Sequence, residues 1–173
     1  MTLEKWGRTS PFGLLRFAQD YHVAARILHR SSEIDEYSMP AYSLIGQSIE
    51  LSLKAFLRAK GVSMKELRSS IGHDLVAAIR RARALGLDRQ VKRRGVRWGA
   101  VDALSDPYKG HRFRYIVTGT VSLPPWDDLD VAAKSLISGL YEHAVRASFS
   151  RAAGQPLLTQ RARFFSQSNR RTP

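Results

Sequence analysis

The stretch "AYSLIGQSIELSLKAFLRAKG", residues 41–61, carries the most apolar helical pattern in the chain. Its apolar residues recur at intervals of three and four, the spacing of one face of an α-helix: Ile45, Ile49, Leu53, and Phe56 or Leu57. Ser38 and Pro40 offer a start for this helix, and Gly61 is a natural residue to follow its last turn. The width of the apolar surface predicts a central helix.

Other segments show the same periodicity together with capping residues. Ser10 and Pro11 begin a helix of about 20 residues, and Ser63 with Glu66 forms a capping-box pattern. The remaining predicted helices lie at 73–85 and from Trp126 onward. Between them, glycines, Pro107 and the β-branched run "YIVTGTV" interrupt the pattern, so only residues 99–105 are expected to be helical there.

These elements predict an all-α fold, with four or five antiparallel helices and an irregular insertion before the last long helix. A chain of 173 residues is one domain by length. We expect the domain to span residues 1–153. Residues 154–173 contain no acid and only weak periodicity, which indicates a basic, mobile tail.

Composition excludes several classes of protein. The chain has no Cys, which excludes disulfides, thiolate metal sites and cysteine nucleophiles. No apolar run is long enough for a signal peptide or a membrane span, so we expect a cytoplasmic protein without membrane contact. Motifs for phosphate-cradling loops, paired metal-binding histidines and serine hydrolases are missing, and no metal or cofactor is predicted.

The formal net charge of +13 is concentrated in one part of the chain. Residues 80–114 hold 11 Lys and Arg against 3 Asp and Glu, a net charge of +8 in one fifth of the sequence. Clustered positive charge attracts phosphate-bearing partners and gains from the release of their counterions. The alternative is a solvated basic face. The residues predicted to contact phosphate are Arg80, Arg81, Arg83, Arg89, Lys92, Arg93, Arg94, Arg97 and Tyr115.

The segment "HRFRYIVTG", residues 111–119, interleaves basic and aromatic side chains. In an extended segment, this alternation would offer guanidinium groups to phosphates and a ring to a base. Burial of Phe113 and Tyr115 under solvent-exposed arginines explains the pattern equally well.

A polar seam crosses the most apolar helix. Glu50 and Lys54 stand four residues apart, in the order that best supports a helix, and Gln47 extends their face. They are a surface ion pair, a partly buried network or a contact with a partner, since Glu and Lys are seldom buried unpaired. Asp74 is grouped with this seam.

The stretch "SSIGHDL", residues 69–75, places a histidine beside an aspartate. Side chains of adjacent helical residues diverge by about 100°, so His73 and Asp74 are not expected to pair with each other. Asp74 is well placed to cap the helix that follows. His73 stays a candidate for proton transfer if its partner comes from elsewhere in the chain.

Three separated pieces occur together in order: "IELSLKAFLRAKG", "IGHDLVAAIRRARALGL" and "PYKGHRFRYIVTG", followed by "SLPP" and a last helix. In this combination the chain, from about Phe12 to Ala147, resembles the bacterial HEPN domain family. The resemblance implies an all-α bundle, often a homodimer. Relatives act as metal-independent ribonucleases of toxin–antitoxin and defence systems, and others bind nucleotides or RNA without cleaving them.

Nuclease members of that family carry an Arg, four to six residues and then a His near the start of a late helix. Arg16 with His22, and Arg68 with His73, match the spacing, but neither pair lies on the last helix. About two matches are expected by chance for so loose a motif. The last helix holds only His143, without an Arg at that spacing.

These observations favour a HEPN-like domain that binds RNA or another phosphate-rich ligand through its basic segment, without cleaving it. A metal-independent ribonuclease is the first alternative, with its site assembled from non-standard positions. Its candidate catalytic residues are His73, His111, Arg112 and Arg114. The second alternative is a protein-interaction module whose polar seam docks a partner chain, such as an antitoxin.

Overall fold

Ser10 starts the first helix, as its position before Pro11 predicts: its side-chain oxygen accepts a hydrogen bond of 3.0 Å from the backbone N–H of Gly13. The computed structural model describes residues 9–31, 38–91, 96–113 and 122–149. The helices in these ranges are α2 (Pro11–Arg30), α3 (Met39–Ala59), α4 (Met64–Glu66), α5 (Leu75–Ala84), α6 (Trp98–Lys109) and α7 (Trp126–Phe149). No strand occurs within them, which confirms the all-α fold class.

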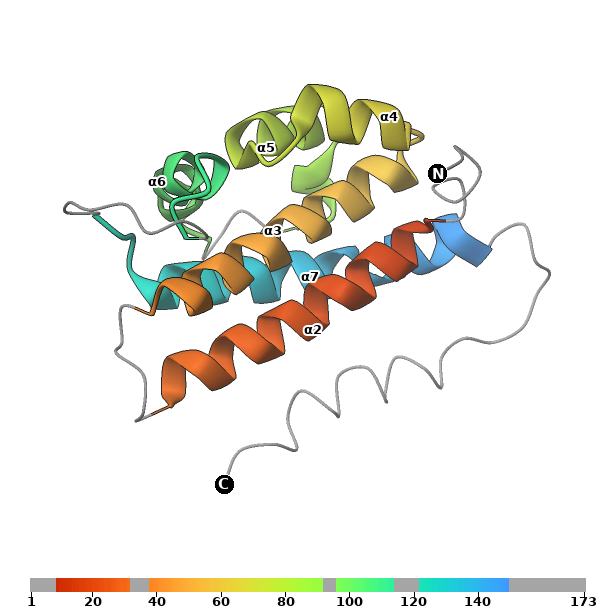
Figure 1. Ribbon diagram of the computed structural model, residues 1–173. Coiled ribbons are helices and arrows are strands. Elements are labelled where there is room, and N and C mark those ends of the chain that lie inside the picture. The colour runs from red at the N-terminus through yellow and green to blue at the C-terminus, as the bar shows by residue number, and fades with distance from the viewer. Residues whose placement is uncertain (1–8, 32–37, 92–95, 114–121, 150–173) are drawn as a thin grey trace, which may run out of the picture.

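Helix α3 lies in the middle of the molecule, as its wide apolar surface predicts (Figure 1). Helices α2 and α7 pack on one side of α3, and α5 and α6 cover the other side. Helix α2 runs antiparallel to both α3 and α7. The C-terminal end of α2 and the N-terminal ends of α3 and α7 therefore meet at one end of the bundle.

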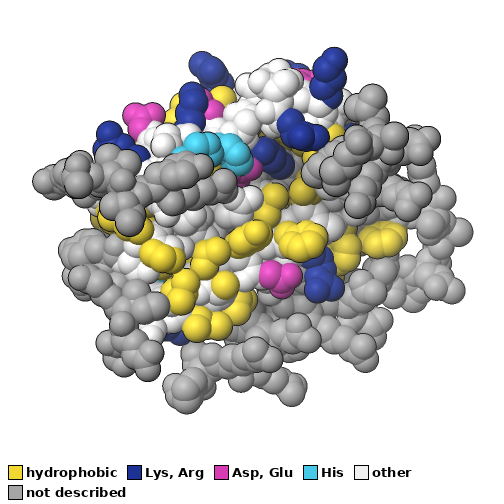
Figure 2. Space-filling model, in the orientation of Figure 1, with side chains coloured by type: hydrophobic (Ala, Val, Ile, Leu, Met, Phe, Trp, Pro, Cys, Tyr) yellow, Lys and Arg dark blue, Asp and Glu magenta, His cyan; other side chains and the backbone are white. Residues whose placement is uncertain are grey.

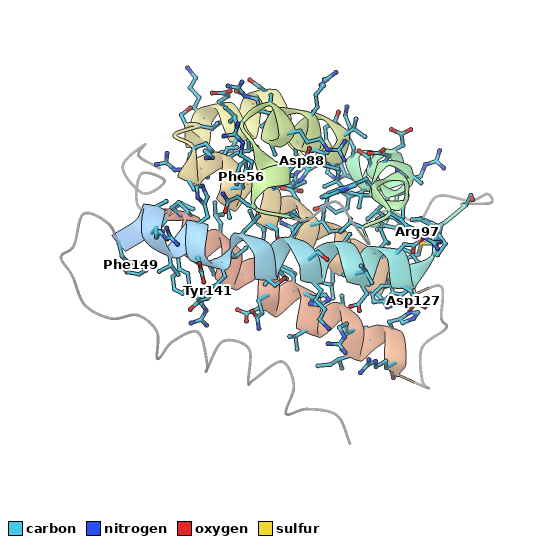
Figure 3. The ribbon with its side chains drawn as sticks, turned by 180° about the vertical axis from the view of Figure 1, so that it is seen from behind. Phe56, Asp88, Arg97, Asp127, Tyr141 and Phe149 are labelled. Carbon is cyan, nitrogen blue, oxygen red and sulfur yellow. The ribbon has the colours of Figure 1, made fainter. Side chains whose placement is uncertain are left out.

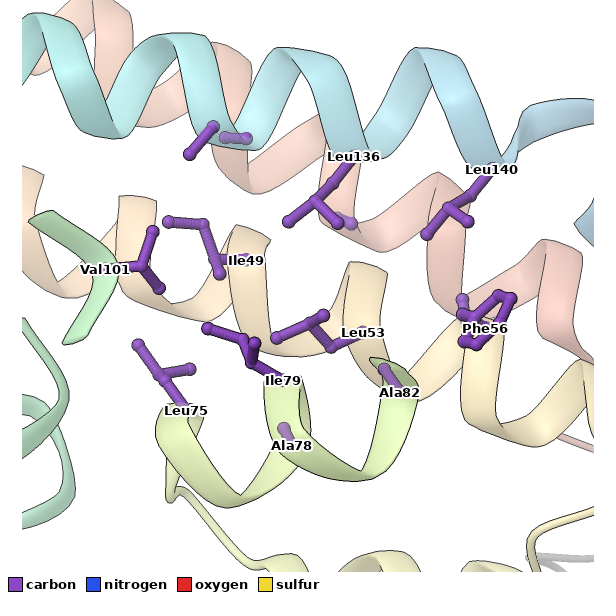
Figure 4. Close-up of a cluster of buried hydrophobic side chains, with 14 of the residues drawn as sticks. Ile49, Leu53, Phe56, Leu75, Ala78, Ile79, Ala82, Val101, Leu136 and Leu140 are labelled. Atoms are coloured by element: carbon purple, nitrogen blue, oxygen red, sulfur yellow. The ribbon is translucent and has the colours of Figure 1, made fainter. Parts of the chain in front are cut away.

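The core fills the space between α3 and its neighbours (Figure 4). The buried side chains drawn there come from four helices: Ile49, Leu53 and Phe56 of α3, Leu75, Ala78, Ile79 and Ala82 of α5, Val101 of α6, and Leu136 and Leu140 of α7. Burial of one such large aliphatic side chain stabilises the fold by about 1.5–3 kcal/mol. This packing fixes the positions from which α3, α5 and α6 present their polar side chains.

Helix α6 differs from the prediction. It extends past Ser105 through Pro107 to Lys109. Proline lacks a backbone N–H, so Pro107 removes the helical hydrogen bond to the carbonyl four residues earlier, and the helix ends only two residues later, at Lys109. The buried side chain of Tyr108 holds this turn against α3.

A π-helical turn, Leu67–Ile71, follows α4 and was not predicted. Its last hydrogen bond runs from the backbone N–H of Gly72 to the carbonyl of Leu67, at 3.1 Å. Gly72 then adopts φ 57° and ψ −123°, a conformation that side chains with a Cβ rarely take. The turn and the glycine together redirect the chain just before His73.

Several predicted features fall outside the described residues. These are Lys92, Arg93, Arg94, Arg114, Tyr115, the rest of the "YIVTGTV" run and the tail 154–173. Among the helices that the structure describes, none is long and apolar enough to cross a membrane.

Candidate active site

The carboxylate of Glu50 is the centre of a buried polar cluster between α3, α5 and α6. Its side chain is only 3% exposed. One carboxylate oxygen, Oε1, accepts a hydrogen bond of 2.6 Å from Nζ of Lys54. The other, Oε2, lies 2.8 Å from Nδ1 of His73 and 2.7 Å from the hydroxyl of Tyr108. Both oxygens therefore have partners, as a buried carboxylate requires.

Lys54 reaches Glu50 from one turn further along α3, at the i, i+4 spacing seen in the sequence. Its side chain is 11% exposed. The polar seam is therefore a buried network, and its interpretation as a surface ion pair is wrong. A buried ion pair is costly to break, since removal of one partner leaves an uncompensated charge.

Tyr108 closes the network from α6. Its hydroxyl also lies 2.8 Å from Oε1 of Gln47. Tyr108 therefore links Gln47 to Glu50, and Lys54 bonds Glu50 directly. Gly46 makes room for the ring: a Cβ at this position would stand 2.5 Å from Cδ2 of Tyr108. A glycine inside this helix is visible in the sequence, but the sequence did not identify its aromatic partner.

His73 and Asp74 diverge, as predicted from their adjacency. Asp74 caps α5: its Oδ1 accepts a hydrogen bond of 2.9 Å from the backbone N–H of Ala77. Its Oδ2 lies 2.6 Å from Nζ of Lys109. The hydrogen bond from Lys109, together with that from Ala77, lowers the pKa of Asp74, and the same contact with Asp74 raises the pKa of Lys109. Asp74 thus belongs to the cap and not to the Glu50 cluster.

His73 is bound at one ring nitrogen and exposed at its outer side. A carboxylate can only accept, so Nδ1–H of His73 donates a hydrogen bond to Oε2 of Glu50, and in the neutral tautomer Nε2 carries the free lone pair. The side chain is 40% exposed. A buried carboxylate that fixes the tautomer and orientation of a partly exposed imidazole is the arrangement that general bases in enzymes use.

The ring of His111 lies beside that of His73, with 5.4 Å between their centroids and 72° between their planes. His111 has φ 56°, an unusual value for a residue other than glycine. Its backbone N–H donates a hydrogen bond of 3.1 Å to the carbonyl of Tyr108, so the turn that follows α6 places His111 beside the cluster. Figure 2 shows histidine side chains gathered on the face between α5 and α6, near several Lys and Arg side chains.

The four candidate catalytic residues have three different outcomes. His73 and His111 come together. Arg112 follows His111 and has an exposed side chain, and Arg114 lies outside the described residues. Residues 111–113 form a turn, so the hypothesis of an extended segment does not apply to this part. Phe113 is half-buried against the core, which agrees with the alternative that this aromatic side chain is buried while the neighbouring arginine faces solvent.

The basic segment contains both paired and unpaired arginines. Arg81 contacts Glu66 at 3.4 Å, Arg83 contacts Asp88 at 3.9 Å, and Arg97 contacts Asp128 at 3.6 Å. Within the described ranges, the exposed guanidinium groups of Arg80 and Arg89 have no acidic partner. Together with the exposed Arg112, these two arginines are available to a phosphate.

A second histidine–carboxylate contact joins α2 to α7. Nε2 of His22 lies 2.6 Å from Oδ1 of Asp130, and Nε of Arg26 lies 3.6 Å from the same oxygen. Burial opposes the charge of Asp130, but the hydrogen bond from His22 and the charges of Arg26 and Lys134 outweigh it and lower the pKa of this carboxyl. His22 is buried in this contact, so the Arg16–His22 spacing reflects packing between helices.

No group of three or more His, Asp or Glu side chains in the described part of the chain comes together as a metal ion would require. A scan against protein-family models, a search of curated proteins and a search of solved structures each found no match.

Proposed function

We propose that this protein is a ribonuclease that cleaves RNA by acid–base catalysis at His73 and His111, without a metal ion. The observation that carries the proposal is the geometry at Glu50. A buried carboxylate holds the Nδ1 side of His73, and a second imidazole lies 5.4 Å away. Two adjacent imidazoles, one of them oriented by a carboxylate, suit a reaction that takes one proton and delivers another.

The chemistry is a transphosphorylation. Nε2 of His73 takes the proton of a ribose 2′-hydroxyl, and the 2′-oxygen forms a bond to the neighbouring phosphorus. The bond from phosphorus to the 5′-oxygen breaks, and this oxygen receives a proton from His111. The products are a 2′,3′-cyclic phosphate and a 5′-hydroxyl. Positioned acid and base groups each contribute about 10²- to 10⁴-fold to such a step.

Positive charge near the two imidazoles supports a phosphate-bearing substrate. Arg112 follows His111 in the chain, and residues 80–114 have a net charge of +8. Guanidinium groups hold phosphate oxygens and stabilise the charge that develops on them. The resemblance to the HEPN family, whose members include metal-independent ribonucleases, favours the same substrate. Binding without cleavage was the leading interpretation of the sequence, and the pairing of His73 with Glu50 now favours catalysis.

Purified full-length protein, incubated with a labelled RNA in the presence of EDTA, provides the test. We expect fragments that end in a 2′,3′-cyclic phosphate. His73→Gln and His111→Gln should each lower kcat by about 10²-fold or more. A strand with a 2′-deoxyribose at the cleavage position should bind but stay intact.

His143→Gln is the matched control, because His143 lies on α7 against Phe56 and away from the Glu50 cluster. This variant should cleave RNA at the wild-type rate. RNA that stays intact with the wild-type protein, or a His73→Gln variant that keeps full activity, would contradict the proposal. Salt-sensitive binding without cleavage would favour the interpretation that the protein binds RNA and does not cleave it.

A further inference from the structure

A pocket of about 420 Å³ lies at the end of the bundle where α2, α3 and α7 meet. Its lining residues are His29, Tyr42, Leu123, Pro124, Pro125, Trp126 and Asp127. The volume falls within the range of small-molecule sites, and the walls are mostly aromatic rings and prolines. None of these residues belongs to the Glu50 cluster.

Three aromatic side chains from three helices build the pocket. The rings of His29 and Trp126 are stacked, with 4.0 Å between centroids and 15° between planes. Tyr42 meets the Trp126 ring edge-on at 5.6 Å, and its hydroxyl donates a hydrogen bond of 3.0 Å to the carbonyl of Pro124. These contacts hold Trp126 in a fixed orientation before any ligand arrives.

The polar atoms of the pocket fit the heterocycle of a nucleotide better than its phosphate. Asp127 is exposed in the lining, and its negative charge repels a phosphate while accepting hydrogen bonds from the amino groups of a base. Nδ1 of His29 is buried and has no hydrogen-bond partner among the described residues. Aromatic walls with a few polar atoms match a nucleobase, which stacks through its face and bonds through its edge.

The pocket and the two histidines are connected through the protein. Tyr42 and Glu50 are both on α3, eight residues apart, which is about 12 Å along the helix. Phe113 stands two residues after His111, and its ring lies 6.4 Å from that of Tyr42. A single strand bound at His73 and His111 therefore reaches the pocket within a few nucleotides.

From these observations we infer that the pocket is a subsite for one unpaired nucleobase of the RNA substrate, stacked against Trp126, whose ring is held in place by His29 and by the buried Tyr42. This inference rests on the proposed function. It adds that the substrate is single-stranded near the cleaved bond, because a paired base cannot enter the pocket. It also assigns Trp126 a role in binding and none in the chemical step.

The test measures binding of a 2′-O-methyl RNA of about eight nucleotides, a length within the range of single-strand sites, which has no 2′-hydroxyl to react. Fluorescence anisotropy with the full-length protein compares this strand with versions that lack one base at each position in turn. We expect base removal at one position to weaken binding by about 5- to 100-fold, the range found for base–aromatic stacking. Removal of bases elsewhere should have a smaller effect.

Trp126→Leu keeps an apolar side chain but removes the stacking ring, so the penalty for the missing base should fall below about twofold in this variant. Phe149→Leu, at the far end of α7 (Figure 3), is the matched control and should keep the penalty. Equal binding of all base-deleted strands to the wild-type protein would overturn the inference even if Trp126→Leu failed to fold. An unchanged penalty in a folded Trp126→Leu protein would overturn it as well.

These outcomes are separate from those of the proposed function, because the 2′-O-methyl strand reports binding alone. If His73→Gln cleaved RNA normally and removal of one base still weakened binding, the proposed catalytic site would be contradicted and the subsite would be supported. If cleavage depended on His73 and no base penalty appeared, the subsite would fail and the catalytic site would stand.

Discussion

Glu50 shows how one residue links the stability of the fold to its proposed chemistry. Its carboxylate compensates the charge of Lys54 and at the same time orients His73. Both contacts lie inside the protein, where a charge without a partner is costly. Substitutions at Glu50 therefore affect folding and activity together, and the two effects must be separated with a second variant.

Glu50→Gln removes the negative charge and leaves the Lys54 ammonium buried without its partner. We expect this variant to lose about 3–5 kcal/mol of unfolding free energy, measured by urea denaturation. The double variant Glu50→Gln, Lys54→Met removes both charges and should recover most of the loss. It should nevertheless remain inactive, because His73 has lost its carboxylate. An active double variant would show that Glu50 does not position His73.

Asp130 allows a similar test with pH as the variable. The pKa of its carboxyl is lowered in the folded protein, so the folded state holds its proton less tightly than the unfolded chain does. Such a carboxyl stabilises the fold above its ordinary pKa of 3.8, and this stabilisation is lost as the pH falls through the lower folded value.

Asp130→Asn should therefore lower the free energy of unfolding by about 1–3 kcal/mol between pH 5 and 7, the usual loss for a buried, charge-assisted hydrogen bond. The difference from the wild type should shrink as the pH falls below 3.8. Denaturant unfolding at several pH values measures it, with Asp20→Asn, an exposed acid of α2, as the control. A difference that persists unchanged at pH 2 would contradict the assignment.

At the scale of the elements, the connection between α4 and α5 positions the proposed base. The π-helical turn adds one residue per turn relative to an α-helix, and Gly72 then takes a positive φ. Together they end one helical path and begin another, so that His73 points to α3 while Asp74 caps α5. Neither the π-helical turn nor the positive φ of Gly72 produces a periodic pattern that could be seen in the sequence.

Gly72→Ala tests this connection. Alanine at φ 57° and ψ −123° is strained by about 1–3 kcal/mol, so we expect that loss of stability together with a displaced His73 and reduced cleavage. Gly61→Ala is the matched control: Gly61 has φ 89° after α3, and an added Cβ would meet no atom within 4 Å. It should lose stability but keep kcat. Equal kcat values for the two variants would contradict a positioning role for Gly72.

The helices themselves were predictable, because their signals are local. Ser10, Ser38 and Asp74 cap α2, α3 and α5 with side-chain hydrogen bonds. The site was not predictable in the same way, since its contacts cross 23 residues from Glu50 to His73 and 58 residues from Glu50 to Tyr108. Periodicity shows that Glu50 lies on an apolar helix, but only packing shows which side chains it meets.

At the scale of the whole molecule, the positively charged segment contributes part of the proposed site. Residues 80–114 have a net charge of +8, and this range includes Tyr108 and His111. Long-range attraction brings a polyanion to such a region before any specific contact forms. Three of the arginines are already engaged with acids, so the number of phosphates held is smaller than the number of cations.

The salt dependence of binding measures how many phosphates the protein holds. If about five phosphates of a non-cleavable single strand are engaged, the logarithm of affinity should fall with the logarithm of salt concentration at a slope of about −3.5. Arg80→Glu with Arg89→Glu reverses the charge of two exposed arginines of the basic segment that have no acidic partner among the described residues. We expect this variant to bind more weakly, with a slope shallower by about 0.7 for each phosphate that it no longer neutralises.

The control variant carries Arg16→Glu and Arg146→Glu, which change the net charge equally but lie on α2 and near the end of α7. Charges separated by more than the Debye length of about 8 Å at physiological salt are largely screened, so the slope of this variant should match that of the wild type. If both variants shift the slope equally, the attraction comes from net charge alone, and the basic segment does not form a binding surface. A change confined to Arg80 and Arg89 would instead place the strand along α5, on the side of the molecule that also presents His73.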